Sequence, residues 1–209
     1  MSPEPDRPGG RDVLDVVDVV VTSLEPAVGS HRWDERAGTL NWSCRRTLAH
    51  VVDCLVWYAA HLARRTSGDV EVPEMDRNAT APVLLDALRS GGALLAAVVE
   101  RADPTDRGWH PFGIADRSGF AAMGCDEALI HGSDIAAGLG VALDPAPPSV
   151  LCERVLRRLF PWAPEGVDPW DALLWANGRQ PLGDRPSDHR WLWHCAPLVE
   201  WDGEVRRMS

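Results

Sequence analysis

The sequence predicts a mainly α-helical protein, in which a four-helix bundle is followed by a short α/β extension. Apolar residues make up 45% of the 209-residue chain, which is enough to form a hydrophobic core. Apolar positions recur with the period of an amphipathic helix in four successive segments, at residues 12–24, 44–65, 82–101 and 119–137. Four such helices in one domain favour a bundle in which their apolar faces meet.

The first two helices are predicted mainly from periodicity. The segment 12–24 is rich in valine, which is typical of a strand, but Asp12, Asp15 and Asp18 recur every third residue. That spacing places the acids on one stripe of a helix and the valines on the other. Before the second helix, Ser43 is a suitable N-cap because its hydroxyl can accept a hydrogen bond from the first turn.

A long loop connects the third and fourth predicted helices. Residues 104–118 are rich in glycine, proline and aspartate, and they also carry Trp109, His110 and Phe112. Aromatic and imidazole side chains are unusual in a simple connection, so Trp109 and His110 are candidates for the mouth of a pocket.

The segment 138–148 interrupts the helical pattern and divides the chain. The predicted parts are a flexible N-terminal tail at 1–10, the helical bundle at 11–140, and a small C-terminal extension at 141–209. In the extension we expect helices near 149–160 and 168–175, and one or two short strands near the aromatic end. Five tryptophans of the extension are expected to pack in its core rather than line a substrate site. They are Trp162, Trp170, Trp175, Trp191 and Trp193.

Charge and composition exclude several functional classes. The formal net charge of −10 argues against nucleic acid as a partner, because phosphate binding needs a clustered basic surface. All 21 basic residues are arginine, so Schiff-base and Walker A chemistry lack their lysine. The polar, proline-rich start does not resemble a signal peptide, and no apolar run predicts a membrane span. Five cysteines without CxxC spacing indicate reduced thiols in a cytoplasmic protein.

The fourth predicted helix carries the strongest functional signal. At roughly 100° per residue, Glu127, His131 and Asp134 share an arc with apolar residues such as Phe120, while Asp126 falls on the opposite side. A buried carboxylate is costly without a partner, so we expect Glu127 to have one. Glu127 and His131 stand one helical turn apart, and both side chains can therefore reach the same metal ion.

The second predicted helix supplies a third candidate ligand. His50, Cys54 and His61 lie along one edge of its apolar arc. A site made of His50, Glu127 and His131 would leave a coordination position open, as in catalytic zinc centres. In a non-catalytic centre, Cys54 or His61 would close that position.

Each candidate histidine ligand begins an H-x-x-D pattern, from His50 to Asp53 and from His131 to Asp134. We expect Asp53 and Asp134 to accept hydrogen bonds from the ligand imidazoles or from a neighbouring helix. The alternative is that these histidines are ordinary hydrogen-bonded core residues, because a Glu–His pair at this spacing also arises by chance. The sequence has no HExxH, which disfavours a zinc protease of that class.

Two stretches resemble a known family. NWSCRRTLAHVVDCLVWYAAHL has a tryptophan before a histidine-bearing helix, and GCDEALIHGSDIAAGLG has the pattern E-x-x-x-H-x-x-D. Both are similar to the mycothiol-dependent maleylpyruvate isomerase metal-binding domain, a relative of DinB-like bundles. The resemblance covers about residues 10–140. It implies a DinB-like four-helix bundle in which His50, Glu127 and His131 hold zinc or another divalent metal.

The resemblance also implies a chemistry. Members of this family use a low-molecular-weight thiol, which is mycothiol in actinobacteria, and a metal-bound thiol is a nucleophile near neutral pH. We therefore expect isomerisation of, or S-transfer to, a small electrophilic or unsaturated acid. Arg179 lies in a stretch that resembles the L-L-x-x-x-G-R segment of the isomerase. It is a candidate to clamp a substrate carboxylate, or else a surface arginine in a turn.

Two other functions stay open from the sequence. The chain would be a regulatory or interaction module if its metal centre were closed, and a metal-assisted hydrolase if bound hydroxide acted without a thiol. Its quaternary state is expected to be a monomer or a homodimer.

Overall fold

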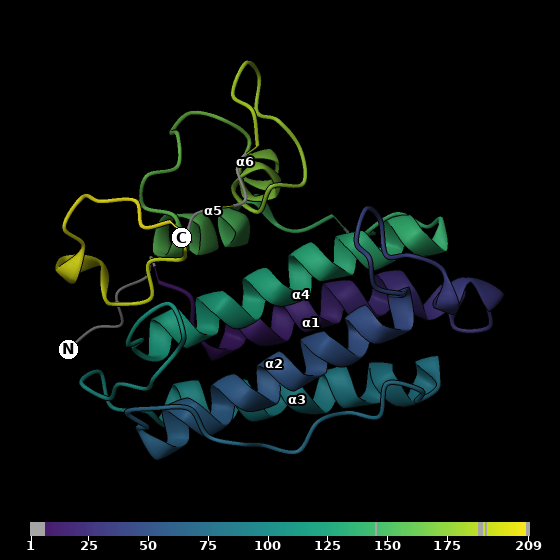
Figure 1. The fold of residues 1–209 in the computed structure, drawn as a ribbon, viewed down its shortest axis with the longest axis horizontal. Helices are drawn as coiled ribbons and strands as arrows, with labels where there is room; N and C mark the ends of the chain where they lie inside the picture. The colour runs from purple at the N-terminus through teal and green to yellow at the C-terminus, as the bar shows by residue number, and fades with distance from the viewer. Residues whose placement is uncertain (1–6, 145, 188–189, 191, 208–209) are drawn as a thin grey trace.

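The computed structural model describes residues 7–144, 146–187, 190 and 192–207. In this part of the chain, four long helices form the bundle: α1 (Gly10–Leu24), α2 (Cys44–Arg64), α3 (Ala81–Arg101) and α4 (Arg117–Leu139). Figure 1 shows α5 (Ser149–Leu159) and α6 (Pro169–Ala176) on the side of α4 that faces away from α2 and α3. The prediction of a mainly helical bundle is confirmed.

The ends of the helices follow from local chemistry. Ser43 caps α2, because its hydroxyl accepts a backbone N–H of the first turn at 3.2 Å. Asp116 caps α4 by accepting the N–H of Gly119 at 2.9 Å, so α4 begins two residues before the predicted start. α4 ends at Gly140, whose φ of 76° lies in the left-handed region that favours glycine.

α1 confirms the helix predicted from its acid spacing. Its core-facing valines are buried, while Asp15 and Asp18 remain accessible to solvent. Asp12 departs from the expected exposed stripe, since it is only 6% exposed. Its carboxylate is paired with Arg154 of α5 at 2.8 Å, and this partner makes the burial tolerable.

α4 is buried on two opposite sides. Asp126 and Leu129 point away from the arc that carries Glu127, yet they are 1% and 0% exposed. The reason is that α5 packs on this second side and that Asn177, at the end of α6, reaches Asp126. The carboxylate of Asp126 accepts a hydrogen bond from Asn177 at 2.9 Å, and burial raises the pKa of Asp126 to about 7. α4 is thus a central helix between two layers, which its periodicity alone did not indicate.

α3 is the one helix of the described residues that is long and apolar enough, by length and composition, to cross a membrane. The sequence expectation that no apolar run is long enough therefore needs qualification. In the bundle, 44% of its apolar window is buried, and the buried side packs against α1 and α2. Packing in the core accounts for part of this apolar composition, while Val83 and Leu94 remain exposed.

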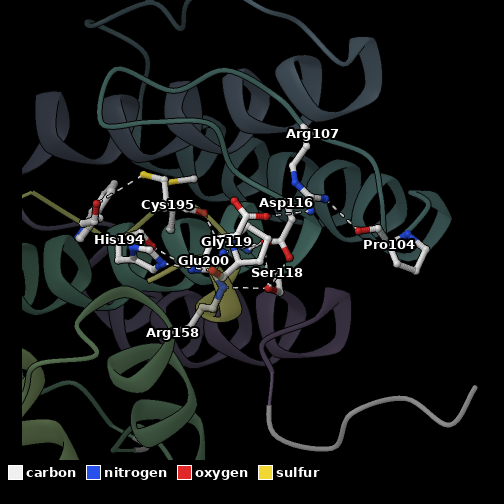
Figure 2. Close-up of polar contacts among 12 residues, drawn as sticks. Pro104, Arg107, Asp116, Ser118, Gly119, Arg158, His194, Cys195 and Glu200 are labelled. Atoms are coloured by element: carbon white, nitrogen blue, oxygen red, sulfur yellow. Dashed lines mark hydrogen bonds and ion pairs between the residues drawn. The ribbon is translucent and has the colours of Figure 1, made fainter. Parts of the chain in front are cut away.

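The C-terminal extension is anchored to the start of α4 through Arg158, which is 1% exposed (Figure 2). The guanidinium of Arg158 donates to the carboxylate of Asp116 at 2.7 Å and to the hydroxyl of Ser118 at 2.9 Å. It also donates to the backbone carbonyls of His194 and Cys195 at 2.9 and 2.8 Å. One buried cation therefore joins α5, α4 and the C-terminal segment.

The approach at this point is so close that Gly119 has no room for a side chain. A Cβ atom there would lie 2.6 Å from the guanidinium of Arg158 and 2.7 Å from the carbonyl of Cys195. Glycine is therefore required by packing rather than by backbone conformation.

The short strands predicted near the C-terminus do not form in the described residues of the extension. That segment consists of loops and a 3-10 turn, Leu198–Glu200, with an isolated bridge between Leu182 and Arg185 and a bridge residue at Arg207. Its backbone groups bond both within the segment and to a helix: the N–H of Leu192 donates to the carbonyl of Arg206 at 2.9 Å, and the N–H of His194 donates to the carbonyl of Leu159 at 2.9 Å. The α/β character expected for the extension is therefore not confirmed.

The tryptophans of the extension divide between two environments. Trp175 is 8% exposed and belongs to the core, as predicted. Trp162, Trp170 and Trp193 are partly buried and pack against that core, but Trp193 also lines a cavity beside α2, contrary to the expectation. Trp191 lies outside the described residues, as do residues 1–6 of the expected N-terminal tail.

Candidate metal centre

Two helices of the bundle place three ligand-type side chains at one point. His50 comes from α2, and Glu127 and His131 come from α4. One potential ligand atom from each residue lies within 4.8 Å of the other two. Glu127 Oε2 is 3.3 Å from His131 Nε2 and 3.7 Å from His50 Nε2. The structure thus brings together the three residues that the sequence indicated.

The tryptophan before α2 helps to place the first histidine. The indole of Trp42 meets the edge of the His50 imidazole, with ring centroids 5.1 Å apart. The guanidinium of Arg46 covers the Trp42 ring at 4.5 Å, which is a favourable cation–π distance. This stack restricts the His50 ring to the edge of α2 that faces α4.

His131 is held by a chain of hydrogen bonds. Its Nδ1 is 3.1 Å from the carboxylate of Asp134, which leaves Nε2 directed at Glu127. Asp134 in turn accepts two hydrogen bonds from Arg179, at 2.7 and 3.2 Å. The structure therefore places Asp134 against a candidate ligand imidazole, as expected from the H-x-x-D spacing.

Arg179 reaches the site in a different role from the one expected. Two of its nitrogens bind Asp134, and a third donates to the carbonyl of Asn177 at 2.7 Å. A guanidinium whose fork is filled by a buried carboxylate is not available to clamp a substrate carboxylate in the same way. Arg179 acts in this arrangement as a positioning residue for Asp134.

Asp53 also differs from the expectation. Its carboxylate accepts the backbone N–H of Met75 at 2.7 Å and pairs with Arg77 at 2.9 Å. In the part of the chain that the structure describes, no hydrogen bond joins Asp53 to His50. The helix turns Asp53 toward the loop that follows α2, so this carboxylate fixes the loop rather than the imidazole.

Burial and charge set the protonation of the three residues. Burial lowers the pKa of His50, and the nearby Glu127 offsets this only in part, so the imidazole is neutral at pH 7. Burial also opposes charge on His131, but hydrogen bonds to Asp134 and Glu127 outweigh it and raise the pKa of His131 to about 9. Burial raises the pKa of Glu127, and the imidazoles more than reverse this, so its pKa lies below the ordinary value.

A cavity of about 350 Å³ opens beside the three residues, and His50 and Glu127 form part of its lining. Aromatic side chains form one wall: Trp57, Tyr58, His110, Phe112 and Trp193. His110 thus lines the cavity, and because it is only 7% exposed its place at the mouth stays a prediction. Trp109 does not line the cavity, because its indole packs behind the wall, 6.0 Å from the ring of Trp57.

A larger cavity, of about 560 Å³, lies between α5 and the loop that follows it. It is lined mostly by proline and apolar residues, together with three charged residues, Glu153, Arg157 and Glu165. No histidine or cysteine lies in this lining, so the smaller cavity is the one associated with the candidate metal ligands.

Sequence reasoning missed the role of Tyr58. Its hydroxyl donates to Glu127 Oε1 at 3.3 Å, and the residue is only 3% exposed. Burial and the neighbouring Glu127 raise the pKa of Tyr58 well above its ordinary value, so the hydroxyl keeps its proton. A polar hydroxyl on the apolar arc of α2, eight residues after His50, was the signal available.

Cys54 and His61, the residues that would close a non-catalytic centre, both lie outside the set of three converging ligand atoms. Cys54 Sγ lies 3.5 Å from His50 Nε2, but it is not part of the set of ligand atoms that lie within 4.8 Å of one another. His61 is fully buried, and its nitrogens contact the carbonyl of Trp57 at 2.9 Å and the N–H of Val70 at 3.1 Å. Both imidazole nitrogens of His61 are therefore occupied.

The comparison with known families adds an independent finding. Residues 18–136 match the family model described as the mycothiol maleylpyruvate isomerase N-terminal domain. The match covers more than half of the chain and includes all three candidate ligands. No curated protein and no solved structure matches the chain.

Proposed function

The chain belongs to the family of the mycothiol maleylpyruvate isomerase N-terminal domain, and on this premise we propose that it is a metal-dependent enzyme that uses a low-molecular-weight thiol, mycothiol, for S-transfer or isomerisation. The observation that carries the proposal is the convergence of His50, Glu127 and His131 beside a cavity. A polar cluster with only a structural role does not require a cavity beside it.

The donor set fits zinc or a similar divalent ion. Two imidazoles and one carboxylate are typical ligands of catalytic zinc, and a three-residue set leaves a position for a further ligand. The hydrogen bond between Asp134 and His131 Nδ1 leaves Nε2 for the ion, and Arg179 fixes Asp134 from behind. When bound, the ion would supply positive charge that lowers the pKa of a thiol to near neutrality.

The protein's own side chains would orient and shield the reacting groups. Tyr58 holds one oxygen of Glu127, so that the other is directed toward the two imidazoles. The aromatic wall limits the access of water, which keeps a thiolate less solvated and more nucleophilic. In S-transfer, the thiol sulfur would form a bond with an electrophilic carbon, the bond from that carbon to its leaving group would break with the electron pair going to the leaving group, and the thiol proton would pass to solvent or to the leaving group.

The alternative is a non-catalytic metal-binding bundle that acts as a regulatory or interaction module. That function requires a closed coordination position, for which Cys54 is the nearest candidate thiol. A metal-assisted hydrolase would use the same open position for water. A cytoplasmic location and a monomeric or homodimeric state stay predictions.

Cobalt-substituted protein tests the proposal, because sulfur ligation to Co²⁺ adds an intense near-ultraviolet charge-transfer band. The experiment uses Cys54→Ala, so that the internal thiol cannot produce the band. We expect the band on addition of mycothiol, and no band when His131→Ala is added as a second substitution. If saturating mycothiol gives no band in a protein shown to hold cobalt, thiol binding is rejected and the module or hydrolase takes its place.

A further inference from the structure

We infer that the cavity beside the metal centre takes an uncharged, planar aromatic or conjugated acceptor, and does not take a small dicarboxylate or other acid. The inference specifies the second substrate of the proposed thiol chemistry, and as a statement about that substrate it rests on the proposed function. Two observations carry it: the aromatic wall of the cavity and the balance of charge around it.

The aromatic wall is a connected set of rings. His110 lies 5.0 Å from Phe112 and 5.7 Å from Trp193, measured between ring centroids, and Phe112 lies 5.7 Å from Trp193. Tyr58 continues the set, with its ring 5.9 Å from that of His110. Rings at these separations present faces and edges on which a flat, conjugated molecule can stack.

The wall comes from parts of the chain that are far apart in sequence. Tyr58 belongs to α2, His110 and Phe112 to the loop before α4, and Trp193 to the C-terminal segment. Phe112 remains 36% exposed, so part of an apolar ring in the lining is in contact with water. An apolar acceptor that covers this ring would remove it from water, which favours binding.

The charge around the cavity is unfavourable for an acid. Three carboxyl groups line it, those of Asp53, Glu74 and Glu127, against the guanidinium of Arg77. Arg77 is itself paired with Asp53 at 2.9 Å and with Glu74 at 3.1 Å. A carboxylate that entered would meet an excess of negative charge, and even a bound divalent ion would only neutralise that excess.

The other groups that recognise carboxylates do not offset this excess. Burial lowers the pKa of His110 to about 4, so its imidazole is neutral at pH 7, and His131 contacts the carboxylates of Glu127 and Asp134 and does not line the cavity. Arg179 is bound to Asp134 and does not line the cavity. Among the described residues that line it, Arg77 is the one permanent cation, and its charge is already neutralised.

A matched pair of unreactive ligands tests the inference by calorimetry. The probes are 4-phenylbutan-2-one and 3-phenylpropanoate, which share the phenyl ring and spacer and differ by a methyl group in place of a charged oxygen. Binding is measured to the metal-free protein, and to the zinc protein saturated with mycothiol, which keeps the carboxylate from simply replacing the thiol. We expect the ketone to bind at least about tenfold more tightly in both forms.

Substitutions test whether the preference for the ketone arises in the cavity beside the metal centre. Trp193→Ala should weaken ketone binding by about tenfold, since it removes a stacking surface. Trp201→Ala is the matched control, because Trp201 lines the separate cavity beside α5. The affinity of this variant for the ketone should equal that of the unsubstituted protein. Asp53→Asn removes one of the two carboxylates that neutralise Arg77, so binding of 3-phenylpropanoate should improve several-fold relative to the ketone.

The thiol reaction forms a separate arm. With zinc protein and mycothiol, 4-phenylbut-3-en-2-one and cinnamate are compared after each rate is divided by its uncatalysed rate. The sulfur bonds to the β-carbon, the α-carbon takes a proton, and the loss of the conjugated absorbance reports the addition. We expect a larger rate enhancement for the ketone.

The outcomes separate the two hypotheses. A preference for the ketone in binding, without any thiol addition, would reject the proposed function and leave the ligand class of the cavity supported. Equal or tighter binding of 3-phenylpropanoate, or equal effects of Trp193→Ala and Trp201→Ala, would overturn the inference whatever the reaction shows. A larger rate enhancement for cinnamate would overturn it as well.

Discussion

The two ends of α4 carry buried polar clusters of different character. At the N-terminal end, the side chains of Asp116 and Arg158 are only 7% and 2% exposed, and they are surrounded by fixed hydrogen-bond partners. In the middle and C-terminal part, the side chains of His50, Glu127 and His131 are 30%, 13% and 16% exposed, and a cavity opens beside them.

The difference separates a structural cluster from a candidate functional one. In the first cluster, a cation with five donors meets a carboxylate, a hydroxyl and two carbonyls, so that little binding capacity is left for a ligand. In the second, three side chains that can each supply an electron pair to a metal ion converge on one point, His131 after loss of its proton. Burial alone therefore does not identify a site, whereas converging lone pairs with access to a cavity do.

The largest expected effect concerns the cluster of Asp116 and Arg158 at the N-terminal end of α4. Arg158→Met removes the cation and leaves the Asp116 carboxylate and two buried carbonyls without their donor, which should cost about 3–5 kcal/mol of unfolding free energy. Urea denaturation measures this loss. Arg157→Met is the matched control on the same helix, because Arg157 is 57% exposed and paired with Glu153 at the surface. A similar, small loss in both variants would contradict the structural role of Arg158.

Metal removal should have the next largest effect on stability, and it acts on the cluster of His50, Glu127 and His131. A divalent ion at about one hundred times its dissociation constant stabilises the folded state by about 2.7 kcal/mol, provided that it binds only that state. A chelator should therefore lower the melting temperature of the zinc-loaded chain, and elemental analysis should show about one ion per chain before treatment. His131→Ala should hold no ion and show no response to the chelator. Full occupancy in His131→Ala would reject the site.

A smaller effect is expected from the outer partner of His131. Asp134→Asn weakens the hydrogen bond that orients the imidazole and the ion pair with Arg179, so metal affinity should fall by about 10–100-fold. Competition with a coloured chelator gives the dissociation constant. Asp53→Asn is the control, because Asp53 bonds to the loop and to Arg77 instead of an imidazole. Equal losses in the two variants would contradict the distinction between these acids.

The smallest expected effect is a pH dependence of the unfolding free energy that arises from Asp116. Burial opposes ionisation of Asp116, but Arg158 and the N–H of Gly119 outweigh it, so the pKa of Asp116 lies below its ordinary value of 3.8. A lowered carboxyl pKa stabilises the folded state above the unfolded pKa, and this contribution is lost as pH falls through the folded pKa. Unfolding free energies measured below pH 4 should therefore fall more steeply for the natural chain than for Asp116→Asn. Equal slopes would show that Asp116 does not contribute.

Much of the fold could be predicted from the sequence because helices depend on local chemistry. Apolar spacing and the Ser43 cap gave the four long helices to within two residues of their observed starts. The C-terminal extension was less predictable, since its irregular segment is held by distant groups such as the Arg158 guanidinium. Aromatic composition favoured strands there, and no local signal showed that the segment stays irregular and bonds in part to α5.

The candidate site also has features that the sequence predicts and features that depend on tertiary packing. Sequence by itself determined that Glu127 and His131 share one side of a helix and that His50 lies at the edge of another, because helical geometry fixes these relations within each segment. Only the tertiary structure decided that Asp134 holds the His131 imidazole while Asp53 turns to the loop, that Arg179 is bound to Asp134, and that Trp193 closes the cavity wall. The physical reason is that periodicity reports how a side chain is oriented on its own helix. Which distant segment packs against that side chain depends on the whole core.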